Sequence, residues 1–513
     1  MSPKTLHERL DPIDRNPTAT LVFGIAGRIG SGASFVSNAL IEELKAYGYT
    51  PVSIKVTEKF FETNDQEMLE EEQEKFSART GLKYQDVSEK AQRIIKLQIK
   101  GDEMRSKFGK NYFAAKSIDY ISKHHSDEKI FDDKDKRFAY IIDSLKHPDE
   151  IDLLRTIFRD SFCLVGVVAD DNVRRKRLRD QKHITDREFE VISEIDADAK
   201  LSHSQHTTNT ILESDYFFEN NYDTPDKINN ECKRLLNLLF NSSIITPRQD
   251  EYGMHLAAIS ANRSACLSRQ VGSAIIAENG TVLASGCNDV PQFGGGLYTS
   301  ESLRDNRCFA KSLMCHNDDE KRIIADEIVK TLREEKIDGL NDQHFELIKT
   351  MLLKKTRLKQ LIEFSRAVHA EMDAIIEVAR SGKAGLVGST MYVTTYPCHN
   401  CAKHIIDAGI KRVVFIEPYV KSLAQKLHSD AINNPLQEKN PNMVSFDNYG
   451  GVSPKRWAEW FSIHGERKKE SKLNRKSLEK DKLLPLGAQE AVALKARFDN
   501  FSSWFKEKIT IID

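Results

Sequence analysis

The sequence predicts two consecutive α/β domains joined by a short polar linker. From about residue 20 to about residue 240, short apolar segments alternate with helical segments, the pattern of a parallel α/β sheet. A new cycle of helix, strand, strand and helix begins near residue 250, and the linker lies between Asn241 and Pro247. We therefore expect one domain over residues 18–242 and a second over residues 248–513.

The first domain begins with a strand that runs into a glycine-rich turn. Leu21–Ala26 is apolar throughout and predicts a buried strand, and a helix is expected from the turn to Gly48. The turn follows the phosphate-binding P-loop pattern G-x-x-x-x-G-K-S/T except that Ala33 stands at the lysine position. The candidate phosphate-binding residues are Gly27, Gly30, Gly32 and Ser34. Backbone N–H groups can still hold a phosphate, but without the lysine phosphoryl transfer is not expected.

A carboxylate and a basic cluster follow later in the same domain. Phe138–Asp143 predicts a buried strand that ends in a carboxylate, which suits Mg²⁺ beside a bound nucleotide. Arg174–Arg177 forms a basic cluster on a predicted helix. The cluster either closes over phosphates or is a solvated helix face. We expect a nucleotide, with Mg²⁺, to bind this domain.

The second domain carries two short motifs with metal-binding chemistry. His369-Ala370-Glu371 is followed by Pro397-Cys398-His399-Asn400-Cys401, with a strand predicted over Met391–Thr395 between them. One imidazole and two thiolates bind zinc and leave its fourth position open for water, so His369, Cys398 and Cys401 are the candidate Zn²⁺ ligands. Glu371 is the candidate general acid and base. This H-x-E…P-C-x-x-C pattern is typical of zinc-dependent nucleobase deaminases.

The blocks around these motifs resemble the deoxycytidylate deaminase family over most of residues 251–418. They are Arg263-Ser264, Gln270-Val271-Gly272, Gly286-Cys287-Asn288 and Pro291. With the P-loop kinase-like first domain, the whole chain resembles the bacterial anti-phage dCTP/dCMP deaminases. The resemblance implies a P-loop NTPase/kinase-like parallel-sheet domain and a cytidine-deaminase-like α/β/α domain. It also implies deamination of free deoxycytidine nucleotides, dCTP or dCMP, which depletes them during phage infection.

The same resemblance implies further partners and site residues. It makes a homo-oligomer and a regulatory RNA or phage-derived trigger the expected partners. Asn288 is expected to bond the sugar hydroxyl, although a turn asparagine is the alternative. Tyr396 either packs against the nucleoside or is a core aromatic. Arg269 and Lys421 are either phosphate contacts or plain surface charges.

An insertion separates the two halves of the second domain. Residues 299–365 exceed the needs of a minimal deaminase and predict helices over 319–335 and 344–364. Cys266, Cys308, Cys315 and His316 are candidates for a second, structural zinc site, with reduced core cysteines as the alternative. The insertion itself is expected to form a lid or an oligomer contact.

Composition narrows the function classes. Lys and Arg number 76 and Asp and Glu 77, so no global basic field favours nucleic-acid binding. Deamination of RNA or single-stranded DNA, or a regulatory nucleotide-sensing role, are the alternative functions. Eight cysteines make no disulfide framework, and no apolar run approaches the roughly 20 residues that a membrane helix needs. We expect a cytoplasmic protein without membrane contact.

Overall fold

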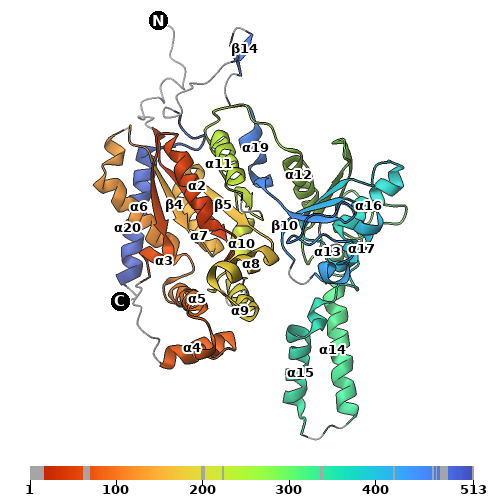
Figure 1. The fold of residues 1–513 in the computed structure, drawn as a ribbon. Coiled ribbons are helices and arrows are strands. Elements are labelled where there is room, and N and C mark those ends of the chain that lie inside the picture. Colours follow the sequence, from red (N-terminus) through yellow and green to blue (C-terminus); the bar gives the residue numbers. More distant parts are fainter. Residues whose placement is uncertain are drawn as a thin grey trace. The chain divides into compact units, whose positions relative to one another are not determined.

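Contacts divide the chain into two units. In the computed structural model the first unit comprises Met1–Pro247 with Asn448–Asp513, and the second comprises Arg248–Asp447 (Figure 1). The structure describes residues 17–61, 70–133, 135–197, 203–221, 224–335, 337, 339–419, 422–464, 467–469, 471–473 and 483–510.

The first unit is built on a sheet of six strands. In spatial order they are β12 (Gly451–Val452), β6 (Tyr216–Glu219), β5 (Phe162–Val168), β2 (Leu21–Gly27), β4 (Phe138–Asp143) and β3 (Thr50–Lys55). The strands from β6 to β3 are parallel, and only β12 runs antiparallel to its neighbour. All seven residues of β2 are buried, as expected for a central strand with both faces covered.

Helices cover this sheet. They include α2 (Ala33–Lys45), α5 (Glu89–Phe108), α6 (Tyr112–Asp127), α7 (Pro148–Phe158), α8 (Asp171–Lys182), α9 (Asp186–Ala197), α10 (Thr207–Leu212) and α11 (Pro225–Leu239). Shorter elements are β1 (Pro17–Thr18), α3 (Val56–Lys59), α4 (Glu70–Thr80), β13 (Lys468–Lys469), β14 (Lys472–Leu473) and β15 (Gln489–Glu490). Leu21, Phe23 and Ile25, alternate residues of β2, share one apolar core with buried side chains of α2 and α11.

The C-terminal segment belongs to the first unit, whereas the sequence suggested a second domain that continues to residue 513. β12 pairs with β6, and α20 (Ala491–Thr510) packs against α6 and α7. Trp460, in α19 (Trp457–Phe461), is buried with its ring 6.4 Å from that of Tyr216. A two-residue strand and scattered aromatic contacts leave no periodic pattern. The sequence therefore did not reveal that the C-terminal segment packs with the first unit.

The second unit has a sheet of five strands. Their spatial order is β11 (Ser445–Asn448), β10 (Arg412–Glu417), β9 (Thr390–Thr395), β7 (Gly272–Ile276) and β8 (Val282–Cys287). The helices are α12 (Gln249–Ala261), α13 (Cys308–Lys311), α14 (His316–Glu334), α15 (Asp342–Lys355), α16 (Ala370–Ser381), α17 (His399–Asp407) and α18 (Ala424–Leu427). β7 is antiparallel to β8 and β9, whereas β9 and β10 are parallel.

Close backbone approach fixes a helix on each face of this sheet. A Cβ on Gly272 would lie 2.0 Å from the carbonyl oxygen of Ala257 in α12, so only glycine fits there. The next residue points to the opposite face, where the Ser273 hydroxyl donates to the carbonyl of Ala370 in α16 at 2.6 Å. α17 shares the apolar core of that second face, so α16 and α17 lie on the same side.

The insertion forms a helical hairpin. α14 and α15 pack against each other and project as a pair from the rest of the second unit (Figure 1). Arg333 on α14 bonds Asp342 at the start of α15 at 3.1 Å. The expected helix over 344–364 is shorter in the structure, because regular helix ends at Lys355 and one turn of 3₁₀ helix follows at Arg357–Gln360. Among the described helices, none is long and apolar enough to cross a membrane.

Candidate active site with a metal centre

Two helix starts bring the candidate metal ligands together. His369 is the residue that caps the start of α16, and Cys398 caps the start of α17, with Cys401 in its first turn. His369 Nδ1 lies 3.4 Å from the Sγ of Cys398 and 3.3 Å from the Sγ of Cys401. Because α16 and α17 cover one sheet face, residues 29 or more positions apart converge on one point.

These three donors fit zinc. A tetrahedral zinc ion with ordinary Zn–N and Zn–S bonds separates nitrogen from sulfur by roughly 3.6 Å. The observed separations are close to this value, and all three donor atoms lie within 4.8 Å of one another. Three protein donors leave one coordination position for a water, as in catalytic rather than structural zinc sites.

The local electrostatics favour a thiolate beside a buried acid. Hydrogen bonds from the Cys401 thiol and the His369 ring lower the pKa of Cys398 well below its ordinary range. The pKa of Cys401 is raised by its hydrogen bond with Cys398 and by burial. Glu371, only 4% exposed, follows His369 by two residues. Burial raises the pKa of its carboxyl, and the neighbouring His369 partly offsets that effect.

A cavity of about 160 Å³ opens beside the three donors. Its lining includes His369, Glu371 and Cys398 together with three of the expected substrate residues, Asn288, Arg269 and Tyr396. The fourth, Lys421, lies outside the described residues. Asn317, Ile362 and Ser365 of the insertion also line this cavity. The insertion therefore contributes directly to the cavity wall, while its action as a lid or as an oligomer contact stays a prediction.

Asn288 is held by the backbone of the loop that borders the cavity. Its Oδ1 accepts from the N–H of Val271 at 2.7 Å, and its Nδ2 donates to the carbonyl of Arg269 at 2.8 Å. The side chain is buried, with one amide hydrogen and one oxygen lone pair beyond these bonds. Asn288 therefore fixes the position of residues 269–271 at the cavity wall.

A polar group that contacts two wall residues, Thr395 and Arg269, was not foreseen. Glu417, at the end of β10, accepts from the hydroxyl of Thr395 at 2.9 Å and pairs with the exposed guanidinium of Arg269. The parallel register of β9 and β10 pairs Thr395 with Glu417, which explains this meeting. Tyr396 packs its ring against Phe415 and Phe446, at centroid distances of 4.8 and 5.3 Å. Its ring is therefore both a core aromatic and part of the cavity wall.

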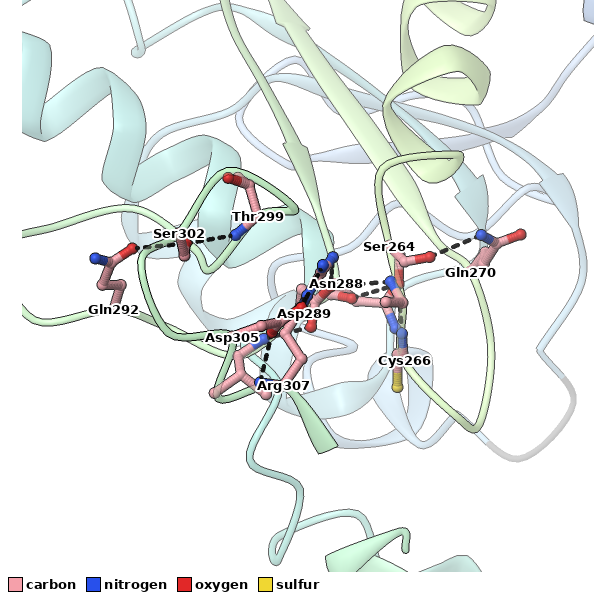
Figure 2. Close-up of polar contacts among 12 residues, drawn as sticks. Ser264, Cys266, Gln270, Asn288, Asp289, Gln292, Thr299, Ser302, Asp305 and Arg307 are labelled. Carbon is pink, nitrogen blue, oxygen red and sulfur yellow. Dashed lines mark hydrogen bonds and ion pairs between the residues drawn. The ribbon is translucent and has the colours of Figure 1, made fainter. Parts of the chain in front are cut away.

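A buried carboxylate joins three segments behind the cavity. Asp289 accepts from the backbone N–H of Ala265 and of Val290, and its carbonyl accepts from Val368, directly before His369. Arg307 lies 3.8 Å from Asp289 and binds Asp305 through two nitrogens. Figure 2 shows this network between the strand end and the insertion. It ties the position of His369 to the first residues of the insertion.

The candidate second zinc site stays a prediction: Cys266 and Cys315 lie close enough to Cys308 to raise the pKa of its thiol, after burial and against the opposing effect of Arg366. Among the described residues, only His369, Cys398 and Cys401 form a group whose donors meet within 4.8 Å. Cys266 lines the cavity beside His369, Cys308 is 3.9 Å from an Arg366 nitrogen, and Cys315 is 3.4 Å from the Ser268 hydroxyl. Cys315 also caps the start of α14, which begins with His316.

The glycine-rich turn of the first unit brings its candidate residues together. Gly30 and Gly32 have φ angles of 80° and 87°, the left-handed conformation that glycine adopts without strain. The hydroxyl of Ser34 donates to Asp143 Oδ2 at 3.0 Å. Gly27 ends β2 directly before this turn. The residues of the basic cluster Arg174–Arg177 have different surroundings. Arg174 and Arg177 are buried beneath the turn, whereas Arg175 pairs with the exposed Asp186.

Comparison with known proteins identifies a matching family for the second unit. Residues 247–417 match the family described as "Cytidine and deoxycytidylate deaminase zinc-binding region". Deoxycytidylate deaminase of Enterobacteria phage T2 is 30% identical over 173 residues, which are 33% of this chain and 80% of the phage protein. That of phage T4 is 28% identical over 201 residues, covering 38% of this chain and 93% of the phage protein. The solved dCMP deaminase of cyanophage S-TIM5 is 18% identical, covering 40% of this chain and 100% of its own, with a TM-score of 0.22.

Proposed function

Because the chain belongs to the deoxycytidylate deaminase family, we propose that its second unit deaminates free deoxycytidine nucleotides by zinc-dependent hydrolysis. Cytosine and water become uracil and ammonia, so dCMP yields dUMP and dCTP yields dUTP. The observation that carries the proposal is the convergence of His369, Cys398 and Cys401 within 4.8 Å, beside a cavity lined by Glu371.

The residues divide the chemistry between them. Zinc held by the three donors would lower the pKa of a water in its open position to about 7. Glu371 is buried beside the ligands and is not one of them. Its carboxylate accepts one proton from the attacking water and donates it to N3 of the cytosine ring. It then accepts the second proton from the same oxygen and donates it to the amino group, which leaves as ammonia.

The cavity wall orients the nucleotide. We assign Asn288 to the sugar hydroxyl, because its amide keeps one free donor and one free lone pair after holding the loop. Tyr396 would pack beside the nucleoside. Arg269 would meet a phosphate by exchanging its exposed pairing with Glu417, which carries little free energy at the surface. Lys421 remains a predicted phosphate contact.

The substrate assignment is tested with the purified full chain. We expect ammonia and uracil products from dCMP, dCTP or both, and none from single-stranded DNA or RNA. CMP and CTP test the preference for deoxyribose. Deamination of the polymers without the free nucleotides would replace this function with nucleic-acid editing.

We further propose that this activity lowers deoxycytidine nucleotide pools in phage defence, supported by the resemblance of the whole chain to anti-phage deaminases. Cells that express the wild type should show fewer plaques and less dCTP during infection than cells that express Glu371→Gln. Equal plaque numbers for the two would remove the defence role. Assembly into a homo-oligomer, control by a regulatory RNA or a phage-derived trigger, and a cytoplasmic location remain predictions from the same resemblance.

For the first unit we propose a P-loop-like, regulatory nucleotide site. Its support is the glycine-rich turn at the carboxyl end of a parallel strand, with Ser34 and Asp143 in hydrogen-bond contact as a candidate Mg²⁺ position. Gly27, Gly30 and Gly32 supply the turn. Phosphoryl transfer is not part of the proposal, because Ala33 replaces the lysine.

A further inference from the structure

A cavity of about 650 Å³ lies at the carboxyl ends of the parallel strands of the first unit. Its wall is formed by the glycine-rich turn, by the loop after β4 and by one face of α5. Five basic side chains line it against two carboxylates, so its field favours an anion. The turn lacks its own lysine, and the structure supplies a cation from elsewhere.

Strand register brings Lys146 to the turn. β2 and β4 are neighbours in parallel register, with Ile25 opposite Asp143, and the N–H of Leu145 donates to the carbonyl of Ile25 at 3.1 Å. The next side chain therefore emerges beside the end of β2. Lys146 Nζ donates to the carbonyl of Gly27 at 2.8 Å and to Asp196 Oδ1 at 2.9 Å.

Asp196 holds both the cation and the turn. Its carboxylate is 1% exposed and accepts from the backbone N–H of Ile29 at 2.9 Å and from the hydroxyl of Thr207 at 3.0 Å. Burial opposes its ionisation, yet Lys146 and these donors keep the pKa of Asp196 below its ordinary value. The Nζ of Lys146 is thus fixed in place between Gly27 and Asp196.

The carbonyl groups of the turn are bound on the side of α8. Arg174 Nε donates to the carbonyl of Ile29 at 2.8 Å, and Arg177 donates to that of Gly30 at 3.3 Å. The first N–H groups of α2, at Ala33 and Ser34, have no partner within the helix, and both residues line the cavity. Donors from the backbone and from Lys146 therefore border one space, the arrangement that a phosphate requires.

The cavity wall also carries two buried amide oxygens, those of Gln98 and Gln205. Gln98 on α5 is 6% exposed and Gln205 is 5% exposed, and both line the cavity. Within the described part of the chain, no group hydrogen-bonds to the Oε1 of either side chain. Such buried acceptors call for a donor from a ligand or from water. Beside α5, the rings of Phe61 and Phe113 stack at 5.2 Å and also line the cavity.

We propose that this cavity binds a nucleoside phosphate, and that Lys146 supplies the cation absent from the glycine-rich turn. The phosphates lie against the turn and Lys146, with Mg²⁺ held by Ser34 and Asp143. The base lies at the α5 end, where its N–H groups donate to Gln98. This assignment rests on the nucleotide-binding role proposed for the first unit and names the residues and the ligand class.

Calorimetric titration of the full chain tests it with ligands that carry no cytosine. The probes are ATP, GTP and UTP with Mg²⁺, and inorganic tripolyphosphate. We expect one of the three nucleotides to bind. Lys146→Met should weaken binding by roughly 10- to 100-fold, the effect of one charge-assisted hydrogen-bonding group, while Lys146→Arg retains most of it. Gln98→Leu should weaken binding of the nucleotide and leave binding of tripolyphosphate unchanged.

Two controls separate the outcomes. Lys45→Met removes an exposed lysine of α2 that bonds only Glu42 in the described structure and should change nothing. The double variant Lys146→Met/Asp196→Asn removes the carboxylate that a single substitution would leave unpaired, and should bind as weakly as Lys146→Met. If the wild type binds none of the probes, the nucleotide site itself is overturned. If Lys146→Met and Lys146→Met/Asp196→Asn both bind as tightly as the wild type, only the lysine assignment is overturned. Deamination of dCMP by the same samples reports on the second unit separately.

Discussion

Asn288 illustrates how one side chain can serve both loop and ligand. The family resemblance implies a bond to the sugar, and the structure adds two bonds to the backbone of Arg269 and Val271. A loop that forms the cavity wall is thereby fixed before substrate arrives, which saves the free energy of ordering it on binding. The same amide retains the hydrogen-bonding capacity that a sugar hydroxyl needs.

Replacement of Asn288 by alanine should therefore reduce deamination without unfolding the protein. We expect kcat/KM for dCMP to fall by about tenfold or more, because two backbone groups lose their partners and the sugar loses one. Steady-state kinetics on Asn288→Ala measure this. Asn279→Ala is the matched control, since that exposed turn asparagine also bonds a backbone N–H, of Thr281, away from the cavity. Equal kinetics for both variants would contradict the assignment.

The meeting of His369, Cys398 and Cys401 was predictable from the sequence, whereas the residues that support them were not. Zinc chemistry restricts His369, Cys398 and Cys401 to a few residue types, and helix starts restrict their spacing, so the motif alone located them. The pairing of Thr395 with Glu417 depends on the register of two strands that are separated by α17 in the chain. Asp289 and Arg307 meet across the insertion. Long-range contacts of this kind leave no pattern in neighbouring residues.

At the level of elements, the docking of α20 depends on a neutral histidine. His125 of α6 is 0% exposed, its Nε2 lies 3.3 Å from the Thr20 hydroxyl, and its ring contacts Phe498 of α20 at 5.2 Å. The rings of Tyr140 and Phe131 complete its surroundings. Burial, and then the neighbouring His124, lower the pKa of His125 from 6.5 to about 3.

Acid should consequently destabilise the first unit through His125. Between pH 6.5 and about 3, His125 binds a proton in the unfolded chain but not in the folded chain. Its contribution to the free energy of unfolding is therefore complete above pH 6.5 and is lost as the pH falls. The expected loss is up to about 1.4 kcal/mol per pH unit. Urea unfolding at about pH 7.5 and about pH 5.5 compares wild type with His125→Phe. Other titrating groups are common to both, so identical pH dependence would refute this role.

For the whole molecule, the first unit is formed by two separate stretches of sequence, and the second unit, Arg248–Asp447, lies between them in the chain. The sequence located the change of unit near residue 247 and the alternation of strands and helices. It did not reveal the return of residues 448–513 to the first unit, because β12 is two residues long and α20 packs through dispersed aromatics. Lys146 was equally hidden, since only the register of β2 and β4 brings it to the turn.

A chain that ends at Asp447 should thus lose stability in its first unit only. It would lack the buried side chains of Trp460, Leu494 and Phe498, each of which contributes about 1.5–3 kcal/mol through burial. Their sum is a large fraction of a domain's stability of about 5–15 kcal/mol. Calorimetry should show an earlier or missing transition, with zinc content unchanged. Unaltered transitions would contradict the division into units.

The most direct test of the central claim is ammonia release from dCMP by Glu371→Gln, with zinc measured in the same sample. Glu371 is assigned as the proton carrier and not as a ligand, so the variant should keep about one zinc per chain and lose at least about 10²-fold in kcat. Cys398→Ser should lose the metal as well. A Glu371→Gln protein that deaminates dCMP at the wild-type rate would contradict the account.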